Sequence, residues 1–282
     1  MIGKKLTVRD IIDLKEAGEK IVVLTAYDAS FGRLLDRSGV EIVLVGDSLG
    51  MVLLGYESTV PVTMEEMLHH CRAVKHGVER ALLVGDMPFL SYQVDTREAI
   101  ANGGRFLKEA GCDAVKVEGG LEICETVAAM VRAGIPVMGH IGLTPQTAGA
   151  LGGYKVQGRD GESARRLLAE AKGVADAGAF ALVLECIPDK LAGAITASIG
   201  IPTIGIGAGP QCDGQVLVSH DLLGMFEKFV PSFVKRYADL APQIAGGIAS
   251  FRDEVKSGAY PDAEHSFVLQ GEVADLLKQG KG

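Results

Sequence analysis

Carboxylate and histidine side chains, which can act as acids, bases or metal ligands, stand where several short apolar runs of this sequence end. Each run holds about four to six residues rich in Val, Ile and Leu, which is typical of strands buried on both faces. One acidic residue after such a run usually starts a loop or caps the next helix, as Asp28 could do for the stretch that follows it. Here an acidic or basic side chain stands at the end of several runs, and this repetition favours one shared site instead. The side chains that close or follow the runs are Asp28, Asp47, Asp86, Glu118, His140 and Glu185.

Carboxylates that converge from several strands need positive charge among them. Without it they repel one another, and a divalent cation is the simplest partner. Hard oxygen ligands without cysteine favour magnesium or a similar ion over zinc. The carboxylates at the strand ends are therefore the candidate ligands.

A lysine and a histidine complete the chemistry that this pattern suggests. Lys116 lies two residues before Glu118, so the period of a strand predicts that both point to the same side. A buried lysine beside carboxylates suits an anionic or carbonyl substrate, and His140 adds another donor. Glu185 follows the apolar run FALVL and is the candidate general base.

The apolar runs alternate with helix-like stretches over most of the chain. Three of these stretches end in Ala-Gly just before the next run, as helix C-termini do. Eight strands in such an alternation predict an α/β fold, a (β/α)8 TIM barrel, and a doubly wound sheet is the alternative. The runs cover 20–28, 41–47, 81–88, 113–120, 135–142, 180–188, 201–209 and 214–221.

We expect one barrel domain over residues 1–282. An extra N-terminal helix over about 7–18, capped by Thr7, could close the bottom of the barrel. Residues from about 255 to 282 are expected to form a C-terminal extension.

Composition excludes several classes of function. The net charge is −8 and no basic stripe is visible, so nucleic acid is not an expected partner. Five cysteines in scattered positions indicate a reducing compartment. No run reaches the roughly 18 apolar residues of a membrane span, so we expect a cytoplasmic protein without a membrane partner.

Several long motifs resemble the 3-methyl-2-oxobutanoate hydroxymethyltransferase (ketopantoate hydroxymethyltransferase) family. They follow one another in the family's order from about Thr7 to Phe267. The motifs are VGDSLGMVLLGYESTVPVTMEEMLHHCRAV, DMPFLSY, VKVEGG, GHIGLTPQ, GGYKVQGR, LECIP, IPTIGIGAG, DGQVLVSHDLLG and EHSF.

The resemblance implies a magnesium-dependent (β/α)8 barrel that transfers a one-carbon unit from 5,10-methylenetetrahydrofolate to 3-methyl-2-oxobutanoate in pantothenate biosynthesis. It implies that Asp47, Asp86 and Glu118 bind the metal, directly or through water, and that Glu185 is the base. It also implies a large homo-oligomer, commonly a decamer. The residues that it places against the keto acid are Asp47, Ser48, Asp86, Lys116 and His140.

Two other functions stay open at this point. A magnesium-dependent 2-oxo acid lyase or mutase of the phosphoenolpyruvate mutase and isocitrate lyase type would share the enolate chemistry but use no folate. A catalytically inactive binding barrel is the non-enzyme alternative, although Glu185 and Asp47 are both present.

Overall fold

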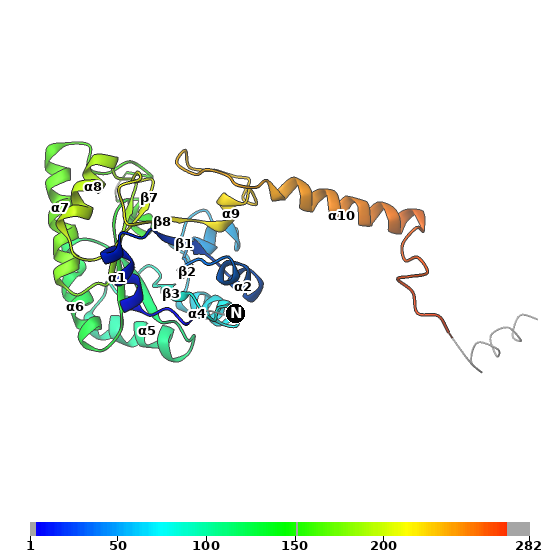
Figure 1. Cartoon of the computed structure of the whole chain (residues 1–282), viewed down its shortest axis with the longest axis horizontal. Helices are drawn as coiled ribbons and strands as arrows, with labels where there is room; N and C mark the ends of the chain where they lie inside the picture. The colour runs from blue at the N-terminus through cyan, green and yellow to red at the C-terminus, as the bar shows by residue number, and fades with distance from the viewer. Residues whose placement is uncertain (1–3, 151, 270–282) are drawn as a thin grey trace, which may run out of the picture.

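Eight parallel strands close into a barrel in the computed structural model, which describes residues 4–150 and 152–269 (Figure 1). The strands pair in chain order, and β8 returns to pair with β1. The predicted TIM barrel is therefore confirmed, and the doubly wound sheet is excluded. The strands are β1 (Ile21–Thr25), β2 (Ile42–Val45), β3 (Leu82–Asp86), β4 (Ala114–Glu118), β5 (Val137–Gly142), β6 (Ala181–Glu185), β7 (Thr203–Ile206) and β8 (Gly214–Leu217).

Helices follow most of the strands and pack on the outside of the barrel. Their apolar faces cover the strands, as the alternating sequence pattern predicts. They are α2 (Ala29–Arg37), α4 (Met64–Lys75), α5 (Thr96–Lys108), α6 (Cys124–Arg132), α7 (Gly161–Asp176) and α8 (Asp189–Ser198), with short turns at α3 (Leu49–Val52), α9 (Ser219–Leu222), η1 (Leu121–Ile123) and η2 (Pro145–Thr147).

Local capping explains where several helices begin. Thr63 and Glu66 form a reciprocal capping box at the start of α4, which satisfies two backbone amides that the helix leaves unpaired. Asp28 caps α2 by accepting from the backbone amide of Phe31, so the capping alternative for this residue is correct.

The extra N-terminal helix, α1 (Val8–Ala17), lies at the N-terminal end of the barrel strands. Thr7 caps it, and its Ile11 is fully buried with the apolar residues that fill the barrel interior. Lys15 on the same helix pairs with Asp213, which precedes β8, at 2.9 Å. The helix therefore covers the end of the barrel opposite to the carboxyl ends of the strands.

One connection differs from the alternating pattern. Residues 207–213, all of which are described, join β7 to β8 without a helix. The outer face of the barrel beside β8 and β1 consequently has less cover, and Val22 on β1 is 46% exposed.

The C-terminal part of the chain contains a long helix, α10 (Leu240–Ser257), that extends away from the barrel (Figure 1). It begins well before residue 255, where the C-terminal extension was expected, and residues 270–282 of that extension lie outside the described residues. None of its residues is buried. Among residues 4–150 and 152–269, no helix combines the length and the apolar character needed to cross a membrane.

Candidate active site

The inward-facing side chains change from apolar to charged along the barrel axis. On β3 the sequence Leu82, Val84, Asp86 points inward at every second residue, and the first two belong to the interior apolar cluster. The same alternation on β4, β5 and β6 brings the chemically capable side chains to the carboxyl ends of the strands, where TIM barrels carry their active sites. They are Lys116 and Glu118 on β4, His140 on β5 and Glu185 on β6.

Lys116 connects the carboxylates of two strands. Its Nζ lies 2.6 Å from Asp86 Oδ1 and 3.5 Å from Glu118 Oε1. All three side chains are at most 5% exposed, so solvent screens these interactions little. The prediction that Lys116 and Glu118 point to the same side is thus supported by a direct ion pair.

His140 lies between two glutamates. Its Nδ1 is 3.3 Å from Glu118 Oε1, and its Nε2 is 3.2 Å from Glu185 Oε2. These are ion-pair distances, but the ring is not aligned for a good hydrogen bond with either carboxylate. Burial alone would lower the pKa of His140, yet the neighbouring Glu118 and Glu185 raise it to about 9, so the ring is cationic at neutral pH.

Asp47 follows β2 and contacts the same cluster. Its backbone amide donates to Asp86 Oδ2 at 3.2 Å, and its Oδ2 accepts from Gln146 Nε2 at 3.0 Å. Burial raises the pKa of Asp47 well above its usual range, and the nearby charges of Asp86 and Glu118 raise it further. Burial also raises the pKa of Asp86, although Lys116 opposes this effect.

Ser48 is held beside Asp47 by an aromatic hydroxyl. The Tyr27 hydroxyl and the Ser48 Oγ lie 2.9 Å apart, and either can be the donor. Tyr27 lies two residues after the end of β1 and is 2% exposed. A buried neighbour therefore holds the serine hydroxyl by a hydrogen bond.

The net charge of the cluster is negative, which favours the binding of a divalent cation. Four carboxylates face Lys116 and His140, so the fully ionised cluster carries a net charge of −2. Burial raises the pKa of Asp47 and of Asp86, and for Asp47 the charges of the neighbouring carboxylates raise it further, so a bound cation would favour the ionised forms.

The carboxylates do not form a complete metal cage. Within residues 4–150 and 152–269, no group of three or more His, Cys, Asp or Glu side chains is arranged to hold a metal ion. Mg²⁺ requires less from the protein, because it keeps several waters and commonly takes only one or two carboxylates. The two buried carboxylates of Asp47 and Asp86 could meet that requirement.

Two polar residues of the site were missing from the sequence prediction. Gln146, in η2, contacts Asp47 and Glu118, and the Tyr92 hydroxyl accepts from the Glu118 backbone amide at 2.9 Å. Both side chains are at most 3% exposed. They lie in the motifs GHIGLTPQ and DMPFLSY, so the motifs offered a signal although neither residue is charged.

The whole barrel matches a known family in sequence. Residues 5–263 match the family model described as ketopantoate hydroxymethyltransferase. A 3-methyl-2-oxobutanoate hydroxymethyltransferase from Desulfotalea psychrophila is 62% identical over 271 residues, covering 96% of this chain and 97% of that protein. An enzyme of the same name from Carboxydothermus hydrogenoformans is 58% identical, covering 97% of this chain and 99% of that protein.

Solved structures with a similar fold are much more distant in sequence. Phosphoenolpyruvate phosphomutase from Streptomyces platensis subsp. rosaceus aligns with a TM-score of 0.61 at 17% identity, over 98% of this chain and 96% of that one. A 2,3-dimethylmalate lyase of the PEP mutase/isocitrate lyase superfamily gives 0.58 at 17% identity, over 98% of this chain and 100% of that one. These likenesses show the barrel fold. The sequence matches over nearly the full length show that the chain belongs to the ketopantoate hydroxymethyltransferase family.

Proposed function

We propose that this chain transfers a hydroxymethyl group from 5,10-methylenetetrahydrofolate to 3-methyl-2-oxobutanoate, giving 2-dehydropantoate for pantothenate biosynthesis. The observation that carries the proposal is one layer of inward-facing side chains. In it Glu185 contacts His140, and Lys116 contacts Asp86, which accepts from the Asp47 amide. The near-complete match to relatives that bear the hydroxymethyltransferase name supports it.

Mg²⁺ is part of the proposal. Asp47 and Asp86, with Glu118 directly or through water, would hold the ion, which when bound polarises the keto oxygen of the substrate. Asp47, Ser48 and Asp86 are also proposed to contact the keto acid. Ser48, fixed by Tyr27, would donate to the substrate carboxylate.

Glu185 is the proposed base that removes the C3 proton of the substrate. The C3 atom of the substrate bears two methyl groups and one proton, which is weakly acidic unless the developing enolate is stabilised. Glu185 takes that proton, while Lys116 and His140 pair with the anionic oxygens of the substrate and hold its orientation. Water first hydrolyses the opened folate iminium, which breaks the bond between its nitrogen and the methylene carbon and gives tetrahydrofolate and formaldehyde. The C3 carbon then forms a bond to the formaldehyde carbon, and the resulting alkoxide takes a proton to become the hydroxymethyl group.

The alternative is a lyase or mutase reaction on a 2-oxo acid, which is favoured only by the shared fold. Both reactions pass through an enolate, but only the transferase needs folate. The two are separated by incubating the full chain with 3-methyl-2-oxobutanoate and Mg²⁺, with and without 5,10-methylenetetrahydrofolate. Formation of 2-dehydropantoate only with folate supports the proposal. Folate-independent cleavage, or no reaction, contradicts it.

The metal assignment predicts a specific change in the Asp86→Ala variant. Removing this carboxylate should raise the Mg²⁺ concentration required for half-maximal activity at least tenfold. Asp28→Ala is the matched control, because Asp28 also follows a strand but caps α2. An Asp86→Ala titration that coincides with wild type would remove Asp86 as a ligand.

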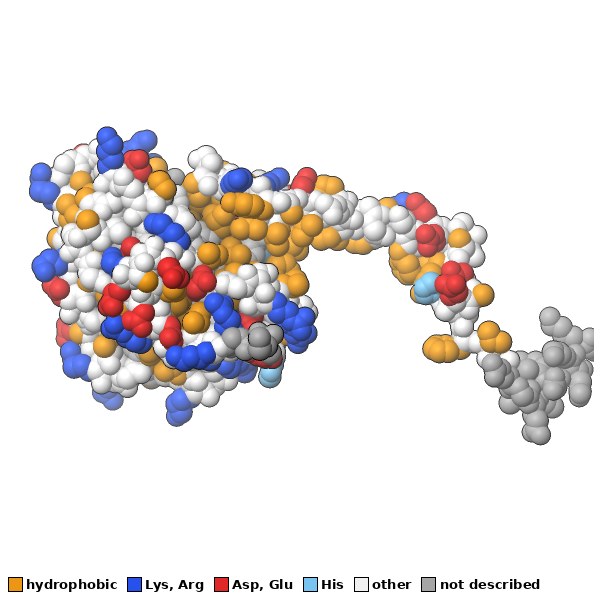
Figure 2. All heavy atoms as spheres, in the orientation of Figure 1, with side chains coloured by type: hydrophobic (Ala, Val, Ile, Leu, Met, Phe, Trp, Pro, Cys, Tyr) orange, Lys and Arg blue, Asp and Glu red, His pale blue; other side chains and the backbone are white. Residues whose placement is uncertain are grey.

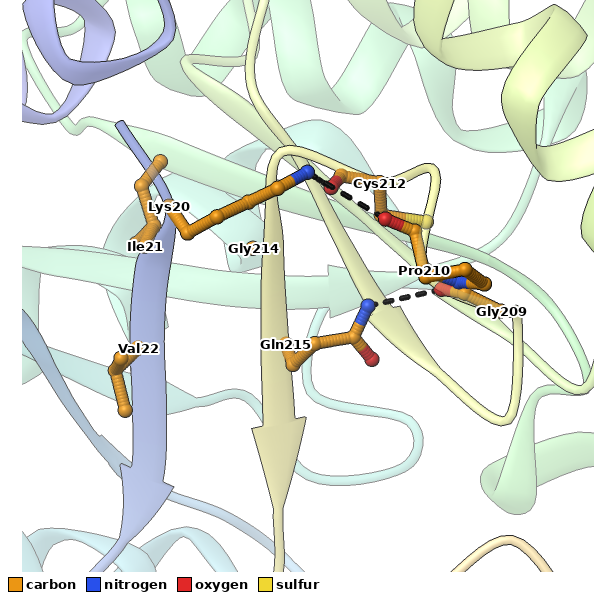
Figure 3. A pocket seen from close by; sticks show the side chains of 8 residues that line it. All are labelled: Lys20, Ile21, Val22, Gly209, Pro210, Cys212, Gly214 and Gln215. Atoms are coloured by element: carbon orange, nitrogen blue, oxygen red, sulfur yellow. Dashed lines mark hydrogen bonds between the residues drawn. The ribbon is translucent and has the colours of Figure 1, made fainter. Parts of the chain in front are cut away.

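We also propose that the chain assembles into a homo-oligomer, a decamer by its family resemblance. A groove of about 440 Å³ lies where the barrel has no covering helix, between β1, β8 and the segment 209–212 (Figure 3). A second hollow of about 520 Å³ shares Gly209 and Gln215 with it. The outer face of β8 and β1 is thus open to an apolar partner.

An apolar stripe on α10 is the partner that we propose for this groove. Ile244, Ile248, Phe251 and Val255 repeat at helical spacing and are 47–65% exposed. Figure 2 shows hydrophobic side chains along α10 and on the neighbouring barrel surface. Since α10 extends away from its own barrel, we propose that it packs in the groove of a second copy.

We also propose a cytoplasmic location, which the five free cysteines support.

A further inference from the structure

Gln146 makes hydrogen bonds to two of the carboxylates that come from different strands. It lies in η2, in the loop after β5, and is 3% exposed. Its side-chain Nε2 donates to Asp47 Oδ2 at 3.0 Å, and its backbone amide donates to Glu118 Oε2 at 3.1 Å. One residue thus holds an aspartate that follows β2 and a glutamate at the end of β4.

The contacts fix which way the Gln146 amide points. Nε2 also lies 2.9 Å from the Met87 carbonyl oxygen, which can only accept a hydrogen bond. The amide nitrogen must therefore face Met87 and Asp47, and Oε1 must face the opposite side. There Oε1 lies 2.8 Å from the Tyr92 hydroxyl and 3.3 Å from Gln93 Nε2.

This arrangement uses both hydrogens of the side-chain amide. Both protons of Nε2 go to acceptors, so the amide cannot rotate without losing buried hydrogen bonds. It presents a fixed donor to one oxygen of Asp47, which leaves the other oxygen, Oδ1, to bind a cation. The Tyr92 hydroxyl links Gln146 to Glu118. It contacts Gln146 Oε1 and accepts a hydrogen bond from the backbone amide of Glu118.

We propose that Gln146 is a positioning residue for the cation site, which orients Asp47 through its side chain and Glu118 through its backbone. The inference rests on the magnesium site of the proposed function and deepens it. Carboxylates that bind metals are themselves held by hydrogen bonds, and losing such a partner typically weakens metal affinity about 10- to 100-fold. Gln146 is the side chain that performs this task for Asp47.

The test is Mg²⁺ binding to the full chain without substrate, measured by isothermal titration calorimetry. Gln146→Met keeps the length of the side chain and removes both amide donors, so the Mg²⁺ Kd should rise about 10- to 100-fold. Tyr92→Phe keeps the ring and removes only the hydroxyl, and should raise the Kd by a smaller factor. It serves as the second variant if Gln146→Met does not fold.

Gln93→Met is the matched control. Gln93 reaches the same Oε1 atom but contacts neither Asp47 nor Glu118, so the Kd of this variant should stay within about twofold of wild type. A purely structural role for Gln146 predicts a lower melting temperature with an unchanged Kd. That result would overturn this inference and leave the proposed magnesium site standing. A wild-type chain that binds no Mg²⁺ would overturn the magnesium site and, with it, this inference.

Discussion

Lys116 determines the charge balance at the centre of the barrel. It is 4% exposed, and its ammonium contacts Asp86 and Glu118 directly. Burial alone would lower the pKa of Lys116, but the carboxylates outweigh this and raise it, so the side chain stays cationic. A buried charge without a partner costs far more than the pair contributes. Asp86 therefore depends on this ammonium group, whereas Glu118 also has the His140 ring beside it.

Lys116→Met should accordingly destabilise the metal-free protein by about 3–5 kcal/mol, since it leaves the buried Asp86 carboxylate without its cationic partner. Saturating Mg²⁺ should recover part of this loss, because the cation replaces some of the missing positive charge. Urea denaturation with and without Mg²⁺ measures both effects. In the control Lys172→Met, which breaks an exposed pair with Asp176, stability should change by no more than about 1 kcal/mol. Equal effects of the two variants would contradict the account.

Periodicity and charge made much of this layer predictable from the sequence. The alternation of a strand placed Lys116 and Glu118 together, and shared strand ends placed Asp86 and Glu185 near them. Gln146 could not be found in this way. It is uncharged and lies in a loop, where no period determines the direction of a side chain.

At the scale of elements, the pairing of β5 with β6 positions the proposed base. Gly142 ends β5 opposite Glu185, and its φ of 97° lies in the region that favours glycine. A Cβ at this position would lie 2.3 Å from the backbone oxygen of Glu185. The same oxygen accepts from the Leu143 amide, so the strand end has no room for a side chain.

Gly142→Ala should therefore lower stability by more than about 1–2 kcal/mol and reduce turnover, because the strand end that carries Glu185 must shift. Gly104→Ala is the control: it lies within α5, a Cβ there meets nothing within 4 Å, and alanine should stabilise the helix by about 0.5–1 kcal/mol. Urea denaturation and product formation measure the two effects. A Gly142→Ala variant as stable and active as wild type would show that the site tolerates movement of this strand end.

The sequence predicted elements best where their signals were local. Thr7 and Thr63 marked helix starts, and the apolar runs marked all eight strands. The start of α10 at Leu240 was not predicted. Its apolar residues repeat at helical spacing and offered a signal, although among the described residues no side chain of this helix is buried.

In the part of the chain that the structure describes, two apolar surfaces are exposed. One is the stripe of α10 and the other is the groove beside β1 and β8. Monomeric proteins rarely expose large contiguous apolar patches, so surfaces of this kind usually mark an interface. Packing of α10 into the groove of a second copy would cover both surfaces together.

Ile248→Asp tests this assembly because it places a charge in the middle of the stripe. Light scattering should show wild type as an oligomer and the variant shifted toward the 29.6 kDa of one chain. Ser250→Asp adds the same charge to another face of α10 and should leave the mass unchanged. A wild-type mass of one chain would refute the proposed assembly.

The central claim is that Glu185 removes the C3 proton of 3-methyl-2-oxobutanoate in a site that binds Mg²⁺. Exchange of that proton with solvent deuterium, followed by NMR with Mg²⁺ and without folate, tests it most directly. Wild type should exchange the proton. Glu185→Gln should bind the keto acid with similar affinity and show no enzymatic exchange, because the amide cannot accept the proton. Undiminished exchange in Glu185→Gln would contradict the claim.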